Sequence, residues 1–305
     1  MEHAAYPARV RRRVEGGGAV RRILTAFLLL PLISLPQAGR WALDFDEDFA
    51  AASAGPVTLT FEYVSTYPAT ITIGGSNYGQ PADPSKALVD AGDGVFVPWT
   101  SNTITLKGKR IRFRGDWRNA SGSLRELFRG TFGGGHNVTM SGGFDFDGAP
   151  ADYMFGSTFQ ECSNLTGSIP VGLFGTLSGA PAANMFRSTF YNCSNLTGSI
   201  PTGLFGNLSG VPASYMFSET FRDCSNLRGP IPVGLFGAIS GAPASDMFNR
   251  TFSGCSKLTG ESALMPDGTT HLYEQFSTAS GNQCDNCYFG ATGLNDYATM
   301  PAAWK

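Results

Sequence analysis

Residues 154–184 read MFGSTFQECSNLTGSIPVGLFGTLSGAPAAN, and this stretch recurs without a gap as MFRSTFYNCSNLTGSIPTGLFGNLSGVPASY (185–215) and MFSETFRDCSNLRGPIPVGLFGAISGAPASD (216–246). A fourth copy starts at Met247 as MFNRTFSGCSKLTGESALMP and then degenerates. An imperfect copy precedes the series from Leu127, and another trails at 288–301. Near-identity at a period of 31 residues indicates a stacked repeat architecture, in which each unit packs only on its neighbours.

Each repeat opens with a segment that predicts a helix. In the third copy Phe217 and Phe221 lie at i and i+4, with Met216 beside them, which places an apolar stripe on one helical face. Pro212 suits the fixed φ of a helix start. The spacing therefore predicts a helix of two to three turns over 212–224.

The next segment of each repeat predicts a short strand. In the first copy Leu165 and Ile169 alternate with Thr166 and Ser168, and Pro170 follows. Gly-Leu-Phe and a further Leu then predict a turn or 3₁₀ segment that fills the core. The sequence thus predicts an α/β, leucine-rich-repeat-like solenoid with one short parallel strand and one short helix per 31-residue coil.

The motif TF-x-x-CSNLTGSIP, with F-x-x-C-x-x-L ahead of Ile-Pro, resembles the leucine-rich repeats of BspA-type bacterial surface proteins over about residues 127–301. The resemblance implies an exported protein that displays a repeat surface for binding other molecules, and it implies no catalytic residues. The period departs from the family's shorter repeat, because the Gly-Leu-Phe…Ser-Gly-x-Pro-Ala stretch is an insertion. That departure leaves the ligand open.

Residues 43–125 predict a different structure, a small antiparallel β unit that caps the repeats at 126–305. Four runs alternate apolar and polar residues, with Gly, Asn, Pro and Asp between them. They are 57–63, 69–73, 104–106 and 111–113. A cap of this kind would block open strand pairing at the first coil.

The same unit carries a cluster of basic residues. The cluster comprises Lys107, Lys109, Arg110, Arg112 and Arg114. One interpretation is a patch for an anionic ligand such as a polysaccharide. Alternation with Ile111 and Phe113 already accounts for the pattern, and we favour a solvated strand face.

Residues 1–42 predict an upstream extension followed by a secretory signal peptide. Arg21 and Arg22 precede the 13-residue apolar run at 23–35, which is shorter than the roughly 20 residues that span a bilayer. These 42 residues hold seven of the 22 basic and two of the 24 acidic side chains, which leaves 15 basic and 22 acidic residues in the remainder. The excess of acidic residues after residue 42 argues against nucleic acid as a partner. We expect a secreted or surface-bound bacterial envelope protein, which would contact the membrane only through the signal segment and only if that segment is not cleaved.

The six cysteines divide into a row and a pair. Cys162, Cys193, Cys224 and Cys255 recur once per repeat, which favours a row of buried thiols over a zinc site or disulfides. Cys284 and Cys287 form a single C-x-x-C, for which we expect a local disulfide in an exported protein.

Nothing in the sequence predicts catalysis, a cofactor or a metal. Outside residues 1–42 the histidines are His136 and His271, in irregular stretches, and no carboxylate pair recurs at catalytic spacing. The predicted function is a non-catalytic binding or adhesion module for host or neighbouring-cell proteins or for surface glycans. The alternative is a passive structural spacer, which the low charge and near-identical units favour.

The predicted binding surface is the outward side of the short strands, called here the strand face. Most of its side chains are small, and their chemistry varies from one repeat to the next. The strand face comprises Thr166, Ser168, Thr197, Ser199, Arg228, Thr259 and Glu261.

Overall fold

A computed structural model describes residues 59–305 except 77 and 145. The predicted signal segment at 23–35 and the extension before it lie outside the described residues. No helix in the described part of the chain is long and apolar enough to cross a membrane.

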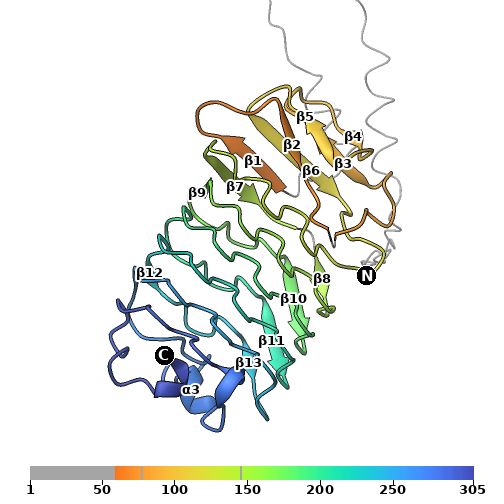
Figure 1. The fold of residues 1–305 in the computed structure, drawn as a ribbon. Coiled ribbons are helices and arrows are strands. Elements are labelled where there is room, and N and C mark those ends of the chain that lie inside the picture. Colours follow the sequence, from red (N-terminus) through yellow and green to blue (C-terminus); the bar gives the residue numbers. More distant parts are fainter. Residues whose placement is uncertain (1–58, 77, 145) are drawn as a thin grey trace, which may run out of the picture. The chain divides into compact units, whose positions relative to one another are not determined.

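The N-terminal part is built from short antiparallel strands at the four predicted runs and at two further places (Figure 1). The strands are β1 (Leu59–Tyr63), β2 (Thr70–Thr72), β3 (Ala87–Asp90), β4 (Val97–Pro98), β5 (Thr103–Thr105) and β6 (Arg110–Gly115). β1 pairs with β6, with Phe61 opposite Ile111, and β2 pairs with β5. Alternate residues of β1 are buried, as period-two patterning requires, and in β6 Arg114 is buried in addition to the alternating Ile111 and Phe113.

One sheet continues from these strands into the repeats. Its order is β4-β3-β6-β1-β7-β9, where β7 is Val138–Gly142 and β9 is Leu165–Thr166. β7 is antiparallel to β1 and parallel to β9. The predicted boundary at residue 125 therefore falls between β6 and β7, within the span of a continuous sheet.

The predicted helix in each repeat is replaced by a run of consecutive turns. Tyr215, Glu219 and Asp223 have φ values of 58°, 56° and 60°, in the left-handed region that an α-helix cannot contain. Backbone N–H groups alternate in direction: Phe217 donates to Met247 of the next coil (3.0 Å), and Ser218 donates back to Tyr215 (3.2 Å). Because the turns repeat every four residues, they bury the same i, i+4 phenylalanines as a helix and also bond each coil to the next.

Two ladders of parallel strands run along the stack (Figure 1). The one at the predicted position is fragmentary: β12 (Gly229–Pro230) pairs with β14 (Leu258–Thr259), and Gly167 bridges Leu196. The other lies where a turn or 3₁₀ segment was predicted. It contains β8 (Asp147–Gly148), β10 (Thr176–Gly179), β11 (Asn207–Gly210) and β13 (Ala238–Ile239).

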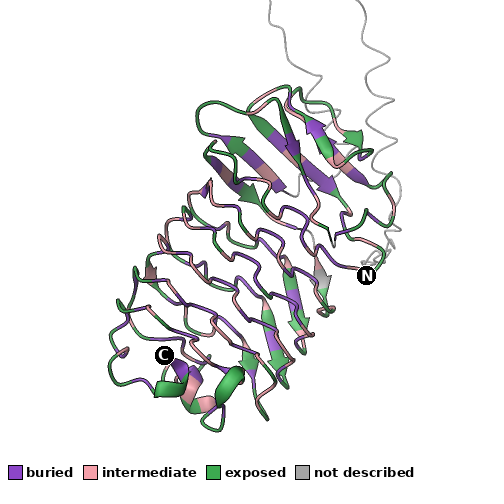
Figure 2. Cartoon of the chain, in the orientation of Figure 1, coloured by how far each residue is buried: buried purple, intermediate pink, exposed green. Residues whose placement is uncertain are grey.

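Buried positions recur in each successive coil (Figure 2). Three rows of phenylalanine account for many of them and fill the space between the turns and the strands. In one row Phe159, Phe190 and Phe221 stack at centroid distances of 5.4 and 5.6 Å with nearly parallel rings. A second runs through Phe186 and Phe217 (5.6 Å), and a third contains Phe174, Phe205 and Phe236. Equivalent residues of successive coils therefore meet face to face.

The Thr and Cys of the motif tie each coil to the one before it. Thr189 Oγ1 donates to the carbonyl oxygen of Phe155 at 2.9 Å, and Cys193 Sγ donates to that of Phe159 at 3.0 Å. Equivalent bonds recur for the Thr and Cys of the neighbouring coils. All four cysteines of the row are buried free thiols, and desolvation raises the pKa of Cys162 to about 12.

The chain closes with an insertion and a last, shortened coil. The insertion holds α3 (Leu272–Gln275) and η1 (Gly281–Gln283), and η2 (Ala302–Trp304) follows the last coil. Phe252 donates its backbone N–H to Cys287, and its ring stacks on Tyr288 at 5.4 Å. Trp304 is buried against this end of the stack.

We expect the chain to lose stability steeply above pH 9. Burial raises the thiol pKa values in the folded state, so the thiols stay neutral there while those of the unfolded chain ionise. Stability is thus full below about pH 9 and falls as the pH rises toward the folded-state values, by up to about 1.4 kcal/mol per pH unit for each buried thiol. Urea unfolding at pH 8, 9 and 10 measures this slope. Cys193→Ala should reduce this slope by the contribution of one thiol. Equal unfolding free energies at pH 8 and pH 10 would contradict the expectation.

Candidate functional site

The predicted strand face lies along the fragmentary strand ladder. Pairing of Thr139 with Thr166 and of Pro230 with Thr259 sets its residues in one line across the coils. Ser168, Ser199, Arg228, Thr259 and Glu261 are exposed, and Thr166 and Thr197 are half-buried. The structure brings the predicted residues together along one side of the stack.

The predicted basic cluster is largely neutralised by neighbouring acids. Arg112 pairs with Asp90 at 2.6 Å, and Arg110 pairs with Glu62 at 3.1 Å. Lys107 pairs with Asp93 and lowers the pKa of that carboxyl. Lys109 is exposed.

Arg114 is buried, unlike the rest of the basic cluster. The residue is only 6% exposed, and its guanidinium carbon lies 4.0 Å from the centroid of the Phe96 ring. Its Nε and Nη1 have no hydrogen-bond partner in the described part of the chain. Burial, and then the charge of Arg112, lowers the pKa of this guanidinium. The cluster thus offers less free positive charge than its composition suggests.

A groove of about 270 Å³ crosses the turns of four successive coils. We call it the arginine groove. It is lined by Arg125, Glu126, Arg129, Tyr153, Gly156, Ser157, Gln160, Arg187, Ser188, Tyr191 and Glu219. Gly156, Ser157 and Ser188 are small, whereas the positions one or two coils away carry Arg or Glu, so the hollow forms where short side chains lie between long ones.

The charges of the arginine groove are held in defined places. The buried carboxylate of Glu126 lies 3.8 Å from Arg125 and 3.6 Å from Arg129. At the other end Glu219 accepts a hydrogen bond from Ser188 (3.1 Å) and pairs with Arg222.

Arg187 differs from the other arginines of the groove. Its guanidinium lies over the Tyr215 ring at 4.9 Å, and its polar contact is a 3.5 Å hydrogen bond to Asn184. Among the described residues no acid pairs with Arg187, which is exposed. The middle of the groove therefore offers a positioned but unpaired positive charge.

Sequence reasoning missed the arginine groove although a signal was present. Its residues are the variable positions of Met-Phe-x-x-Thr-Phe-x-x-Cys, which read Gly-Ser and Gln-Glu, then Arg-Ser and Tyr-Asn, then Ser-Glu and Arg-Asp. Because the units are otherwise nearly identical, these differences indicate the face of the stack whose side chains change from one repeat to the next. Gln160, Glu161, Arg187, Tyr191 and Asn192 are exposed or half-buried, whereas Gly156, Ser188 and Ser218 are buried.

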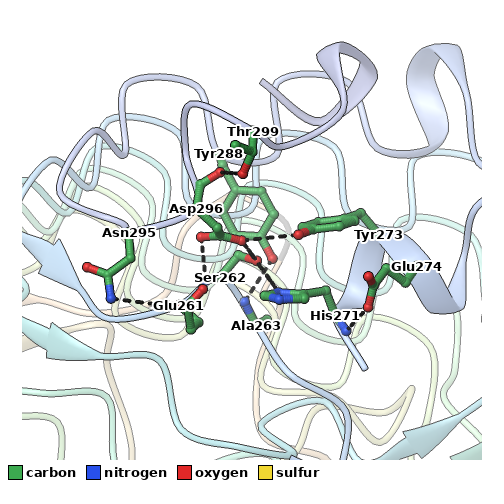
Figure 3. A network of polar contacts seen from close by, with 10 residues as sticks. All are labelled: Glu261, Ser262, Ala263, His271, Tyr273, Glu274, Tyr288, Asn295, Asp296 and Thr299. Carbon is green, nitrogen blue, oxygen red and sulfur yellow. Dashed lines mark hydrogen bonds and ion pairs between the residues drawn. The ribbon is translucent and has the colours of Figure 1, made fainter. Parts of the chain in front are cut away.

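A second polar cluster joins the insertion to the last coil (Figure 3). Ser262 Oγ donates to Asp296 Oδ2 at 2.6 Å and lies 2.9 Å from Nδ1 of His271. Nδ1 of His271 is 3.4 Å from Asp296 Oδ2, and Tyr273 donates to the same oxygen at 3.4 Å. Glu261 lies beside them, and one ligand atom from each of Glu261, His271 and Asp296 falls within 4.8 Å of the others.

This cluster lacks the arrangement of a serine hydrolase. In a catalytic triad the serine contacts one imidazole nitrogen and the carboxylate holds the other. Here Ser262 and Asp296 both face Nδ1, and the Ser262 proton is directed to Asp296. The geometry suits a hydrogen-bonded brace or a set of cation ligands, and no spacing in the sequence links its three segments.

The remaining predicted site residues are distributed differently from expectation. Cys284 and Cys287 are separate buried thiols in the structure, not the expected disulfide; Cys284 donates to the carbonyl oxygen of Ala303 at 3.5 Å. The backbone N–H of Cys287 donates to the Cys284 carbonyl at 3.0 Å, so the two cysteines stand at the two ends of one turn. His136 lies at the N-terminal sheet, 3.1 Å from Thr66 Oγ1, far along the chain from the His271 cluster.

Comparison of the chain with protein-family models, with curated proteins and with solved structures found no match.

Proposed function

We propose that this chain is an exported, non-catalytic repeat module that binds an acidic glycan in the arginine groove. The observation that carries the proposal is Arg187, an exposed guanidinium held over an aromatic ring, in the middle of a hollow, without an acidic partner in the described residues. A carboxylate or sulfate group matches the fork of N–H donors that such a guanidinium presents.

The remaining lining favours a sugar polymer as the carrier of that anionic group. Gln160, Ser157 and Ser188 offer neutral hydrogen-bonding groups beside Arg187, and Tyr191 adds an aromatic ring. The groove runs along the stack for three coil steps of about 4.8 Å each, so it suits an extended ligand. The apolar run at 23–35 supports export, and the resemblance to bacterial surface repeats supports display outside the cell.

A binding experiment with matched arginine variants tests the site. The full chain is titrated with an acidic polysaccharide, such as polygalacturonate or a sulfated glycan, and with neutral dextran. Arg187→Ala should weaken binding of the acidic polymer by about 10- to 100-fold, which corresponds to the loss of one charge-assisted contact. Arg228→Ala removes an exposed arginine of the strand face and should leave this affinity unchanged.

The outcomes separate the candidate surfaces. Weakening by Arg228→Ala but not by Arg187→Ala would move the site to the strand face and overturn the groove. If neutral dextran bound as tightly as the acidic polysaccharide, recognition of an anionic group would be contradicted. If the chain bound none of the polysaccharides or matrix proteins on an array, the passive structural spacer would be favoured.

A further inference from the structure

The Glu261, His271 and Asp296 side chains carry ligand atoms of the kind that divalent transition metals bind. They combine one imidazole nitrogen with carboxylate oxygens from two residues. Nitrogen-and-oxygen sets of this type suit Zn²⁺ and its neighbours better than Ca²⁺, which takes six to eight oxygens. We propose that these three residues form a divalent metal site that fastens the C-terminal end of the repeat stack.

The distances fit a metal of this size. Two ligands at about 2.0–2.1 Å from a tetrahedral zinc ion lie about 3.3–3.4 Å apart. Nδ1 of His271 and Oδ2 of Asp296 are 3.4 Å apart. Glu261 is exposed, and its ligand atom falls within the same 4.8 Å group, so rotation of one side chain brings it to the ion.

The backbones that carry the ligands are already bonded to one another. Asn295 N–H donates to the Gly260 carbonyl at 2.8 Å, and Ser262 N–H donates to Asp296 Oδ1 at 2.9 Å. Leu272 N–H donates to the Ala263 carbonyl at 2.9 Å, which places the start of α3 beside residues 260–263. These bonds hold the three segments that carry the ligands next to one another.

Residues behind the ligands orient them. The His271 ring stacks on Tyr273 with centroids 4.8 Å apart and an interplanar angle of 9°. Ser262 and Tyr273 both donate to Asp296, as the outer-shell partners of ligating carboxylates do (Figure 3).

Zinc uptake by the full, reduced chain tests the proposal. We expect one Zn²⁺ per chain by metal analysis after gel filtration, a rise in melting temperature of a few degrees, and no uptake of Ca²⁺ at the same concentration. Glu261→Gln changes an exposed side chain and should weaken zinc binding at least about tenfold without altering the metal-free melting temperature. His271→Gln should abolish both uptake and the thermal shift.

Two controls separate this site from other ligands in the chain. His136→Gln and His3→Gln should bind zinc as the unaltered chain does. Undiminished uptake by His271→Gln would place the metal on other groups, such as thiols, and overturn the proposal. Absence of uptake by the unaltered chain would leave the cluster as a hydrogen-bonded brace and overturn it as well.

Discussion

Phe190→Ala is expected to lower the free energy of unfolding by about 3–5 kcal/mol, the range for removing a buried aromatic side chain. Phe190 is fully buried, and its ring contacts Phe159 at 5.4 Å, Phe174 at 6.0 Å and Phe221 at 5.6 Å. The loss therefore opens a cavity shared by three successive coils, where no single neighbour can move in to fill it.

Urea unfolding measures this effect, and Phe289→Ala is the matched control. Phe289 is 58% exposed and lies in the last coil. Its replacement should change the unfolding free energy by no more than about 0.5 kcal/mol. Comparable losses of unfolding free energy in the two variants would show that the stacked phenylalanine row contributes no more to stability than an exposed phenylalanine does.

Gly206→Ala is expected to prevent folding or to cost more than about 4 kcal/mol, well beyond an ordinary substitution. A Cβ at this position would overlap the carbonyl oxygen of Leu177 in the preceding coil, and the backbone φ is +71°. Gly175 and Gly237 occupy the same place in their coils, against Phe146 and Leu208. The second Gly of the Gly-Leu-Phe-Gly motif is thus required because one coil passes directly over the backbone of the next.

Gly203→Ala separates backbone strain from this collision. Gly203 has nearly the same φ, +70°, but no atom lies within 4 Å of a Cβ built on it. Its replacement should cost only the left-handed strain of about 1–2 kcal/mol. Thermal melts of both variants give the comparison, and similar losses would mean that the coils separate easily at this point.

The 31-residue period and the inward phenylalanines could be predicted from the sequence, but the path of the chain between them could not. Phe217 and Phe221 lie four residues apart in both an α-helix and the observed turns. The features that separate the two are the left-handed conformations of Tyr215 and Glu219, and neither residue type signals them. The strand at 176–179 was missed because its flanking glycines indicated a turn.

The arginine groove and the His271 cluster escaped prediction for different reasons. The groove depends on which coils lie side by side, so its signal was the variation among repeats and not a motif within one. Glu261, His271 and Asp296 come from three segments without a characteristic spacing, and only the insertion around α3 brings His271 back to the strand end.

The alternating backbone bonds between coils have a consequence for how such a molecule can change length. Because Phe186 donates to Met216 as Phe217 donates to Met247, an in-frame loss or gain of one 31-residue unit restores every kind of core contact. Recombination between near-identical coding units could therefore shorten or extend the stack without penalty to its interior. An event of this kind between residues 125 and 219 would remove or rearrange the arginine groove, because its lining comes from four particular coils in a fixed order. The interior of the stack thus tolerates a change in the number of repeats, whereas the proposed binding surface depends on the order of the repeats.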